Sequence, residues 1–263
     1  MVVRIKSALI GAAAAALAPG AAQAHMPYLM PNYFDVTARD HVTVQASFTE
    51  DVFAPDVVMR SDAWFARGPA GSTPIAQVNY MRDLAAFEVA LPAAGTYRIS
   101  SGERLGRKSK MFRNTAGQWI MTGEGGDAGG APLVDVQSVT IAEAYVTRQS
   151  PTRDVLAASG KGLDLVPITH PNEIFAMEPA RFELQFEGKP LEGALVTVYR
   201  AAGVYDGGKV AAELTTDAAG RFSITPPDGG TYLALVRHRT EAPAGAETPY
   251  RSYSYALTFE ATQ

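Results

Sequence analysis

A histidine directly follows a segment that has the features of a protease recognition site. The stretch AAQAHMPYLMPNYF, residues 21–34, places His25 after Ala22-Gln23-Ala24. Cleavage after Ala24 would give His25 a free α-amino group, whose pKa is usually about 7.7–8.0, so that a metal can displace its proton near neutral pH. The amine and the imidazole Nδ1 would close one chelate ring, a histidine brace once another imidazole joins. Nitrogen-rich tetragonal sites of this kind suit Cu(II) or Ni(II).

Two further histidines are candidate ligands. His170 lies in THPNE after the strand-like run 163–167, at a domain boundary where ligand sites are common. His238 ends the strand-like run 233–237 and could join a site at the rim of a sheet. The alternatives are an interface histidine bonded to backbone for His170 and a solvated surface histidine for His238. His41 follows Asp40 in an apparently exposed turn and is the least favoured ligand.

Carboxylates and methionines near these histidines could tune a metal site. A carboxylate often orients a ligand imidazole from outside the coordination shell, although surface charge is the simpler explanation for each one here. Thioether sulfur would add soft contacts if the metal is copper, with packing as the alternative role. The residues concerned are Glu50, Asp51, Asp56, Glu173, Met26 and Met30.

The first 24 residues have the composition of a secretory signal peptide. Arg4 and Lys6 precede a short apolar, alanine-rich run, and the segment ends in an A-x-A sequence. The run is well under the roughly 18 residues that a membrane-spanning helix requires. An alanine-rich helix is the alternative, but Pro19 and Gly20 would break it. We therefore expect a periplasmic protein without a transmembrane segment in its mature chain.

Composition excludes several classes of function. Removing residues 1–24 takes away Arg4 and Lys6, so the formal net charge of −4 becomes −6, which argues against nucleic acid as a partner. The chain contains no cysteine, so neither disulfides nor thiolate ligands are possible. The sequence has no G-x-S-x-G, H-E-x-x-H, phosphate-loop or dinucleotide motif, and we assign no catalytic residue and no enzyme activity.

The elements that must position these residues read as β-strands. PAAGTYRI at 92–99 and PDGGTYLAL at 227–235 are similar turn–strand units, which predicts two tandem β-sandwiches. Short alternating runs at regular spacing support an all-β fold of Ig-like or transthyretin-like sandwiches. We predict an N-terminal domain over 25–148, a linker with a short helix over 149–162, and a C-terminal domain over 163–263.

A segment of different character interrupts the first predicted domain. Residues 101–132 hold five basic side chains and then the glycine-rich run GEGGDAGG at 123–130. We predict a long loop excursion with a mobile tip. Its basic cluster is most simply a solvated loop, and a patch for an anionic surface is the alternative.

The C-terminal half resembles a known family. The runs GLDLVPITHPNEIF, FELQFEGKPLEGALVTVYR and TTDAAGRFSITPPDGGTYLALVRHR resemble an exported, uncharacterised family described as periplasmic components of nickel or cobalt uptake. The resemblance covers about residues 160–260 and the His25 start. It implies metal binding through His25, with His238 at the matching late-strand position, and a membrane metal transporter as partner. The same runs are similar to transthyretin-like and carboxypeptidase-regulatory-like sandwiches, a likeness that specifies fold and not function.

Three functions are therefore expected in order. The first is a periplasmic protein that binds a divalent transition metal, nickel, cobalt or copper, through His25, His238 and His170 and assists its uptake. The second is a carbohydrate- or protein-binding envelope module, and the third is a copper oxygenase-like enzyme. Aromatic side chains suited to a sugar platform in the second case are Trp64, Trp119, Tyr250, Tyr253 and Tyr255.

Overall fold

The computed structural model describes residues 25–122 and 127–263, and the predicted signal peptide lies outside these ranges. The described chain is almost entirely β-structure, which confirms the predicted fold class. Its helices are single turns: the 3-10 helices η1 (Asp154–Leu156) and η2 (Pro171–Glu173) and the α-helix α1 (Gly203–Asp206). In the described ranges, then, helices long and apolar enough to cross a membrane are absent.

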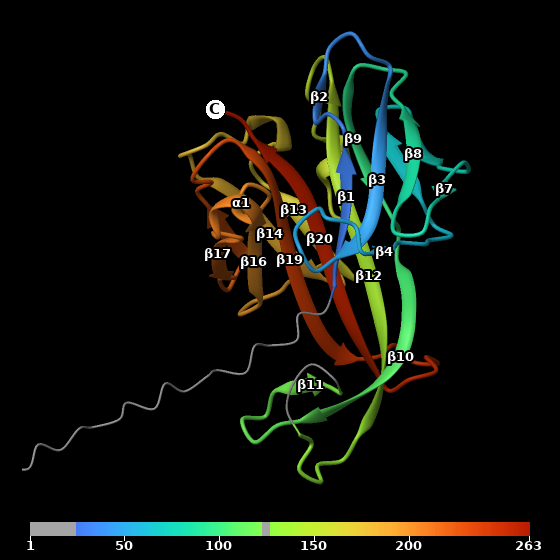
Figure 1. Cartoon of the computed structure of the whole chain (residues 1–263), viewed down its shortest axis with the longest axis vertical. Helices are drawn as coiled ribbons and strands as arrows, with labels where there is room; N and C mark the ends of the chain where they lie inside the picture. Colours follow the sequence, from blue (N-terminus) through green and yellow to red (C-terminus); the bar gives the residue numbers. More distant parts are fainter. Residues whose placement is uncertain (1–24, 123–126) are drawn as a thin grey trace, which may run out of the picture.

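A central sheet of eleven strands runs through the whole molecule (Figure 1). Its main path follows the order β17-β16-β19-β20-β12-β9-β5-β6, while β2 and β10 also pair with β12, and β11 pairs with β10. The bounds are β2 (Asp35–Val36), β5 (Phe65–Gly68), β6 (Gly71–Pro74), β9 (Gly95–Ser100), β10 (Arg104–Arg113), β11 (Trp119–Met121), β12 (Val134–Arg148), β16 (Leu195–Arg200), β17 (Val210–Thr215), β19 (Gly230–Glu241) and β20 (Tyr250–Ala261).

Two smaller sheets cover the central one. The first sheet has the order β1-β3-β8-β7, with β4 paired to β3, and the third has the order β13-β14-β15, with β18 paired to β14. The first sheet contains β1 (Met26–Pro31), β3 (His41–Thr49), β4 (Val57–Val58), β7 (Asn79–Tyr80) and β8 (Ala85–Ala90). The third sheet contains β13 (Leu163–Pro167), β14 (Ala180–Phe186), β15 (Lys189–Pro190) and β18 (Arg221–Ile224).

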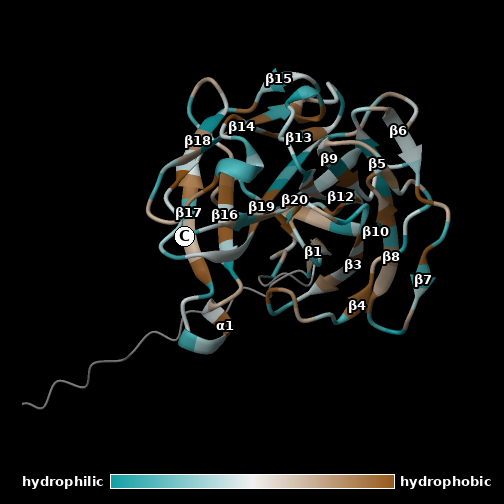
Figure 2. Cartoon of the chain, turned by 90° about the horizontal axis from the view of Figure 1, so that it is seen from above, coloured by the Kyte–Doolittle hydropathy of each residue, from teal (hydrophilic) through white to brown (hydrophobic). Residues whose placement is uncertain are grey.

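The two covering sheets lie on opposite faces of the central sheet. Successive side chains of a strand point to opposite faces, so β12 contributes side chains to the cores on both faces of the central sheet. Ala142, Ala144 and Val146 join the core under the first sheet. Val139 and Tyr145 join the core under the third sheet. Viewed from above, β12, β19 and β20 of the central sheet lie between the strands of the first sheet and those of the third sheet (Figure 2). The molecule is thus a pair of β-sandwiches that share a sheet.

The shared sheet depends on one parallel strand pair. β12 of the predicted N-terminal domain pairs with β20 of the predicted C-terminal domain from Val136↔Tyr250 to Ala144↔Thr258. The segment 149–162 between the halves contains η1, a single 3-10 turn. The exact domain boundaries at 148 and 163 stay predictions.

The two similar turn–strand units adopt the same local structure. Gly95 and Gly230 begin β9 and β19 with φ of 139° and 147°, a conformation that favours glycine. Two residues later, Tyr97 donates its hydroxyl to the carbonyl of Ala93 and Tyr232 to that of Asp228, each at 2.8 Å. This tyrosine contact, which reaches back four residues, is a known corner device of β-sandwiches.

The predicted excursion is a β-hairpin arm. β10 and β11 pair antiparallel and, with the start of β12, extend away from the two sandwiches (Figure 1). Met111 and Phe112 are buried, while Lys110 pairs with Asp135 at 2.8 Å. The strands were predicted as loop because most of β10 is polar and exposed, so it lacks a clear alternating pattern. The predicted mobile tip falls partly on residues 123–126, which lie outside the described ranges.

Candidate metal site at the chain start

The residues that follow His25 form a buried edge strand. β1 contains Pro27 and Pro31, which a sheet tolerates at its edge because proline cannot donate a ladder hydrogen bond. β1 pairs with β3 from Met26↔Thr49 to Pro31↔Val44. Met26, Tyr28 and Leu29 are fully buried beneath neighbouring strands. The first residue after the predicted cleavage point is therefore joined to a rigid element.

The register of β1 and β3 places a carboxylate beside His25. Because Met26 faces Thr49 in an antiparallel pair, the next position on each strand brings His25 opposite Glu50. The Nε2 atom of His25 lies 3.5 Å from Oε1 of Glu50. Both side chains remain accessible, with 42% of His25 and 65% of Glu50 exposed. This pair, which we call the N-terminal site, is open to solvent.

The turn that carries Glu50 is held in place by the packing of the residues that follow it. The backbone N–H of Glu50 donates to Oδ2 of Asp56 at 2.6 Å. Asp51 forms an ion pair with Lys209 of the C-terminal half, but this pair is solvent-exposed and contributes little to holding the turn. Val52 is buried and Phe53 half-buried in a cluster with Met26, Leu233 and Leu235. The position of Glu50 thus follows from packing and not from its own contacts.

The pKa of Tyr28, beside this turn, differs from its ordinary value. The pKa of Tyr28 is raised above its ordinary value, first by burial and second by the charge of Asp56. Its hydroxyl donates to the carbonyl of Phe53 at 3.5 Å. Burial is thus the main cause of the shift, and the charge of Asp56 adds to it.

His170 has both ring nitrogens engaged in structural hydrogen bonds. The residue is 2% exposed. Its Nε2 lies 3.0 Å from the carbonyl of Thr152 and 3.1 Å from Oγ1 of Thr96. Its Nδ1 accepts the backbone N–H of Asn172 at 3.1 Å, which caps η2. Because a carbonyl only accepts, Nε2 donates to Thr152, and the ring ties the segment 149–162 to β9.

His238 lies on the far face of the central sheet from the N-terminal site. It alternates with Ala234 and Val236, which belong to the core under the third sheet. Its ring packs 4.7 Å from that of Phe186, and burial lowers its pKa below 6.5. Met26, next to His25, packs against Leu233 and Leu235, which point to the opposite face of the same strand.

The structure therefore does not bring the three predicted ligands together. His25 is accessible beside Glu50, His170 is buried in a hydrogen-bond network, and His238 is separated from His25 by the sheet. Across residues 25–122 and 127–263, no group of three or more histidine, aspartate or glutamate side chains is arranged to hold a metal. His41 lies on the surface, with Nδ1 2.9 Å from Asp40.

The aromatic residues of the alternative sugar platform are mostly internal. Trp64, Tyr253 and Tyr255 are buried in the cores. Trp119 packs against Tyr250 at 4.9 Å, and the guanidinium of Arg113 lies 4.6 Å from its ring centre. Trp64, Tyr253 and Tyr255 are therefore closed to a sugar, while Trp119 and Tyr250 are half-buried against each other.

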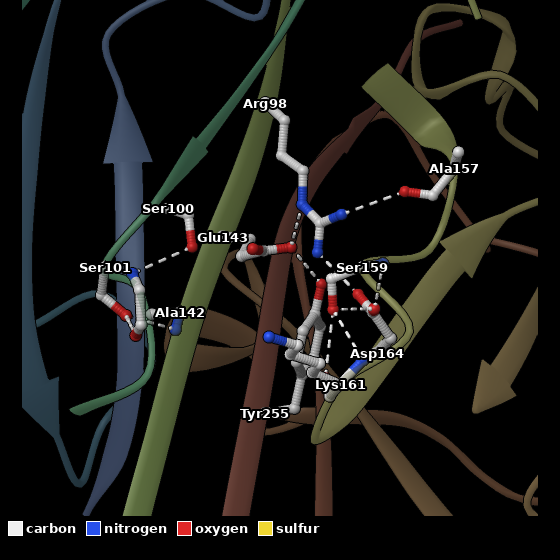
Figure 3. A network of polar contacts seen from close by, with 11 residues as sticks. Arg98, Ser100, Ser101, Ala142, Glu143, Ala157, Ser159, Lys161, Asp164 and Tyr255 are labelled. Carbon is white, nitrogen blue, oxygen red and sulfur yellow. Dashed lines mark hydrogen bonds and ion pairs between the residues drawn. The ribbon is translucent and has the colours of Figure 1, made fainter. Parts of the chain in front are cut away.

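Sequence reasoning missed a buried charge network at the junction of the two halves. Arg98 of β9 donates through Nε to Glu143 of β12 at 2.8 Å and through Nη2 to Asp164 of β13 at 2.6 Å (Figure 3). Tyr255 of β20 also donates to Glu143, and Ser159 donates to Asp164. We call these five residues the junction network. The signal that could have revealed it is a charged residue inside each of two apolar strands, Arg98 in GTYRIS and Glu143 in IAEAYV.

Electrostatics holds Arg98 in its charged form. Burial by itself lowers the pKa of Arg98, but the nearby negative groups, led by Glu143, raise it well above its usual value. The pKa of Tyr255 is raised by burial and then by Glu143, so its hydroxyl keeps its proton. The side chains of Arg98, Glu143 and Asp164 are 7%, 2% and 4% exposed, so the charged centre of the network is closed to a ligand.

Comparison with known sequences identifies one family. Residues 22–240 match the profile of the family described as "Domain of unknown function (DUF4198)". The curated proteins contain no match to the chain. The match includes His25 and most of the described strands, and it attaches no activity to them.

Solved structures with similar strand arrangements are distant. A trypsin-activated alpha-2-macroglobulin from Escherichia coli is 12% identical with a TM-score of 0.23, and the match covers 92% of this chain but 16% of that protein. A two-domain fibronectin type-III segment of chicken tenascin is 13% identical with a TM-score of 0.23, covering 89% and 99%. The FN1–FN3 domains of chicken CNTN1 are 8% identical with a TM-score of 0.25, covering 91% and 100%. Likeness at this level carries no functional argument.

Proposed function

The chain belongs to the family described as a domain of unknown function, DUF4198, and from the geometry of its start we propose that the mature protein binds a divalent transition metal through His25 in the periplasm. Nickel and cobalt are the first candidates and copper is a further one. The protein would capture the ion and pass it to a membrane transporter. No turnover of a substrate is part of this proposal.

One observation carries the proposal. His25 directly precedes a buried strand whose register is fixed over six residue pairs, yet its own side chain is 42% exposed. Cleavage after Ala24 would thus present the α-amine and the imidazole at a defined position on the surface. A terminus held in this way loses less conformational freedom when it chelates a metal than a loose terminus would.

The available donor atoms favour a divalent ion over Cu(I). The amine and Nδ1 of His25 are nitrogen donors, and the nearest carboxylate, Glu50, lies beside the other ring nitrogen, Nε2. Met26 is 2% exposed and packs into a core cluster, so its sulfur does not face the site. Since the chain has no cysteine and soft ligands select Cu(I), the set fits Ni²⁺, Co²⁺ or Cu²⁺.

An incomplete ligand set agrees with transfer to a partner. His170 is engaged and His238 lies across the sheet, so His25 supplies the nitrogen donors that this part of the chain offers. A two-nitrogen chelate leaves coordination positions for water or for side chains of a receiving protein. Such openness suits a carrier better than a storage site.

The test compares two forms of the protein that differ by one residue. Mature protein that begins at His25 and a form with one extra alanine before it are titrated with Ni²⁺, Co²⁺ and Cu²⁺ by calorimetry. We expect at least about 100-fold weaker binding in the extended form, because the added peptide bond turns the amine nitrogen of His25 into an amide nitrogen, which is a far weaker donor. Equal affinity of the two forms would refute the proposal. N-terminal sequencing of the exported protein checks that cleavage occurs after Ala24.

A further inference from the structure

We propose that Glu50 is the residue that positions the His25 imidazole for metal binding. This inference rests on the proposed function. The chelate through the amine and Nδ1 leaves the other ring nitrogen, Nε2, carrying a proton. The structure places Oε1 of Glu50 3.5 Å from that nitrogen and not from Nδ1. Histidine ligands usually donate their free N–H to a carboxylate or carbonyl, which fixes the tautomer and the ring orientation.

The structure separates Glu50 from the other acidic residues nearby. Asp51 points to the C-terminal half and pairs with Lys209. Asp56 accepts the backbone N–H of Glu50 itself at 2.6 Å. Of the carboxylates in this turn, Glu50 is the one within ion-pair distance of His25. From the sequence alone, Glu50, Asp51 and Asp56 could not be distinguished as partners of His25.

The backbone around Glu50 makes the contact a property of the fold. Glu50 faces His25 because β1 and β3 pair in a fixed register, and a shift of one residue would turn Met26 out of the core. The turn after Glu50 is packed through Val52 and Phe53 against the central sheet. The Glu50 carboxylate therefore lies beside the His25 ring before any metal binds, and metal binding does not have to move it there.

The experiment uses the mature protein starting at His25, its variants E50A and E50Q, and D51N as the matched control. Ni²⁺ affinity is measured by calorimetry and the Cu²⁺ environment by electron paramagnetic resonance. We expect E50A to weaken Ni²⁺ binding about 10–100-fold, the usual effect of removing such a partner. E50Q should recover part of the loss, because its amide oxygen can still accept the Nε2 proton. The Cu²⁺ spectrum should change in E50A and stay unchanged in D51N.

Each other result overturns the proposal in a recognisable way. If E50A matches D51N and wild type in affinity and spectrum, Glu50 does not position the ring, and the extension test then decides separately whether the His25 chelate stands. If E50Q is as weak as E50A, Glu50 is a direct ligand and not a positioning residue. If the one-residue extension binds as tightly as the mature form, the proposed function itself fails. Because Glu50 is 65% exposed, all variants should unfold at the same urea concentration, which checks that they fold.

Discussion

Two of the places where ionisable side chains meet in this protein have opposite surroundings. In the junction network, Arg98 contacts Glu143 and Asp164, and all three side chains are at most 7% exposed. In the N-terminal site, His25 and Glu50 are 42% and 65% exposed. The charged side chains of the junction network are surrounded by protein donors and acceptors. In the N-terminal site, His25 and Glu50 contact each other and face solvent.

The difference separates architecture from function. Buried ions lose much of their hydration, so each must find protein partners, and removing one partner leaves an uncompensated charge. The junction network joins strands of both halves at the place where they share a sheet. An exposed pair contributes little to folding, so its residues are free to serve another purpose. Strength of interaction in the structure is therefore a poor guide to the binding site.

The largest effect should come from breaking the junction network. We expect R98M to lower the free energy of unfolding by about 3–5 kcal/mol, because Glu143 and Asp164 would remain buried without their cation. Urea unfolding at neutral pH measures the change. K110M is the control, since Lys110 and Asp135 are each 52% exposed and their pair should contribute less than about 1 kcal/mol. Similar losses in both variants would contradict the contrast between the two regions.

The strands of both halves could be predicted from sequence, but their association could not. Alternating runs at 41–48, 85–91, 182–186 and 194–199 predicted β3, β8, β14 and β16 within a residue or two of their ends. The parallel pairing of β12 with β20 joins residues more than a hundred positions apart and leaves no local pattern. β1 was missed as a strand because its two prolines oppose one, and only its place at the sheet edge makes them acceptable.

The candidate site was likewise predictable only in part. The cleavage pattern named His25 and the acidic turn named Glu50, but their contact depends on the register of β1 and β3. His170 and His238 were judged by their position along the chain. Their availability depends on burial and on the face of the sheet, and both follow from long-range packing. Residue type can suggest a ligand, whereas convergence requires the tertiary structure.

A second prediction treats His170 as part of the architecture. H170A should lower the free energy of unfolding by about 1–3 kcal/mol, because the carbonyl of Thr152 and the N–H of Asn172 lose their partner. Ni²⁺ affinity of the mature protein should stay at the wild-type value. Thermal or urea unfolding and calorimetric titration on the same sample measure both quantities. H41A, at an exposed position, is the control and should change stability by no more than about 0.5 kcal/mol. Loss of metal affinity in H170A would return His170 to the ligand set.

The third prediction tests the other side of the contrast. E50A should change the free energy of unfolding by no more than about 1 kcal/mol, since the His25–Glu50 pair is solvent-exposed. The same variant is expected to weaken metal binding, so stability and function should respond independently. Parallel urea unfolding of the metal-free proteins provides the measurement. A loss as large as that of R98M would mean that the chain start belongs to the folding core.

The smallest effect concerns His238, which lies between the two extremes because it is half-buried. Burial against Phe186 lowers its native pKa below 6.5, so the folded protein resists the proton that the unfolded chain accepts. Between that lowered pKa and 6.5 the unfolded state binds more protons, and the free energy of unfolding must fall as the pH decreases. The contribution of the neutral ring is fully present above pH 6.5.

H238Q, which cannot titrate, should lose less stability than wild type when urea unfolding is repeated from pH 7.5 down to pH 5. Its Ni²⁺ affinity at pH 7.5 should equal that of wild type, because the ring faces the core under the third sheet. Identical pH profiles for the two proteins would show that the ring is as hydrated as an exposed histidine, and a weakened metal affinity would show that it reaches the site from the opposite face.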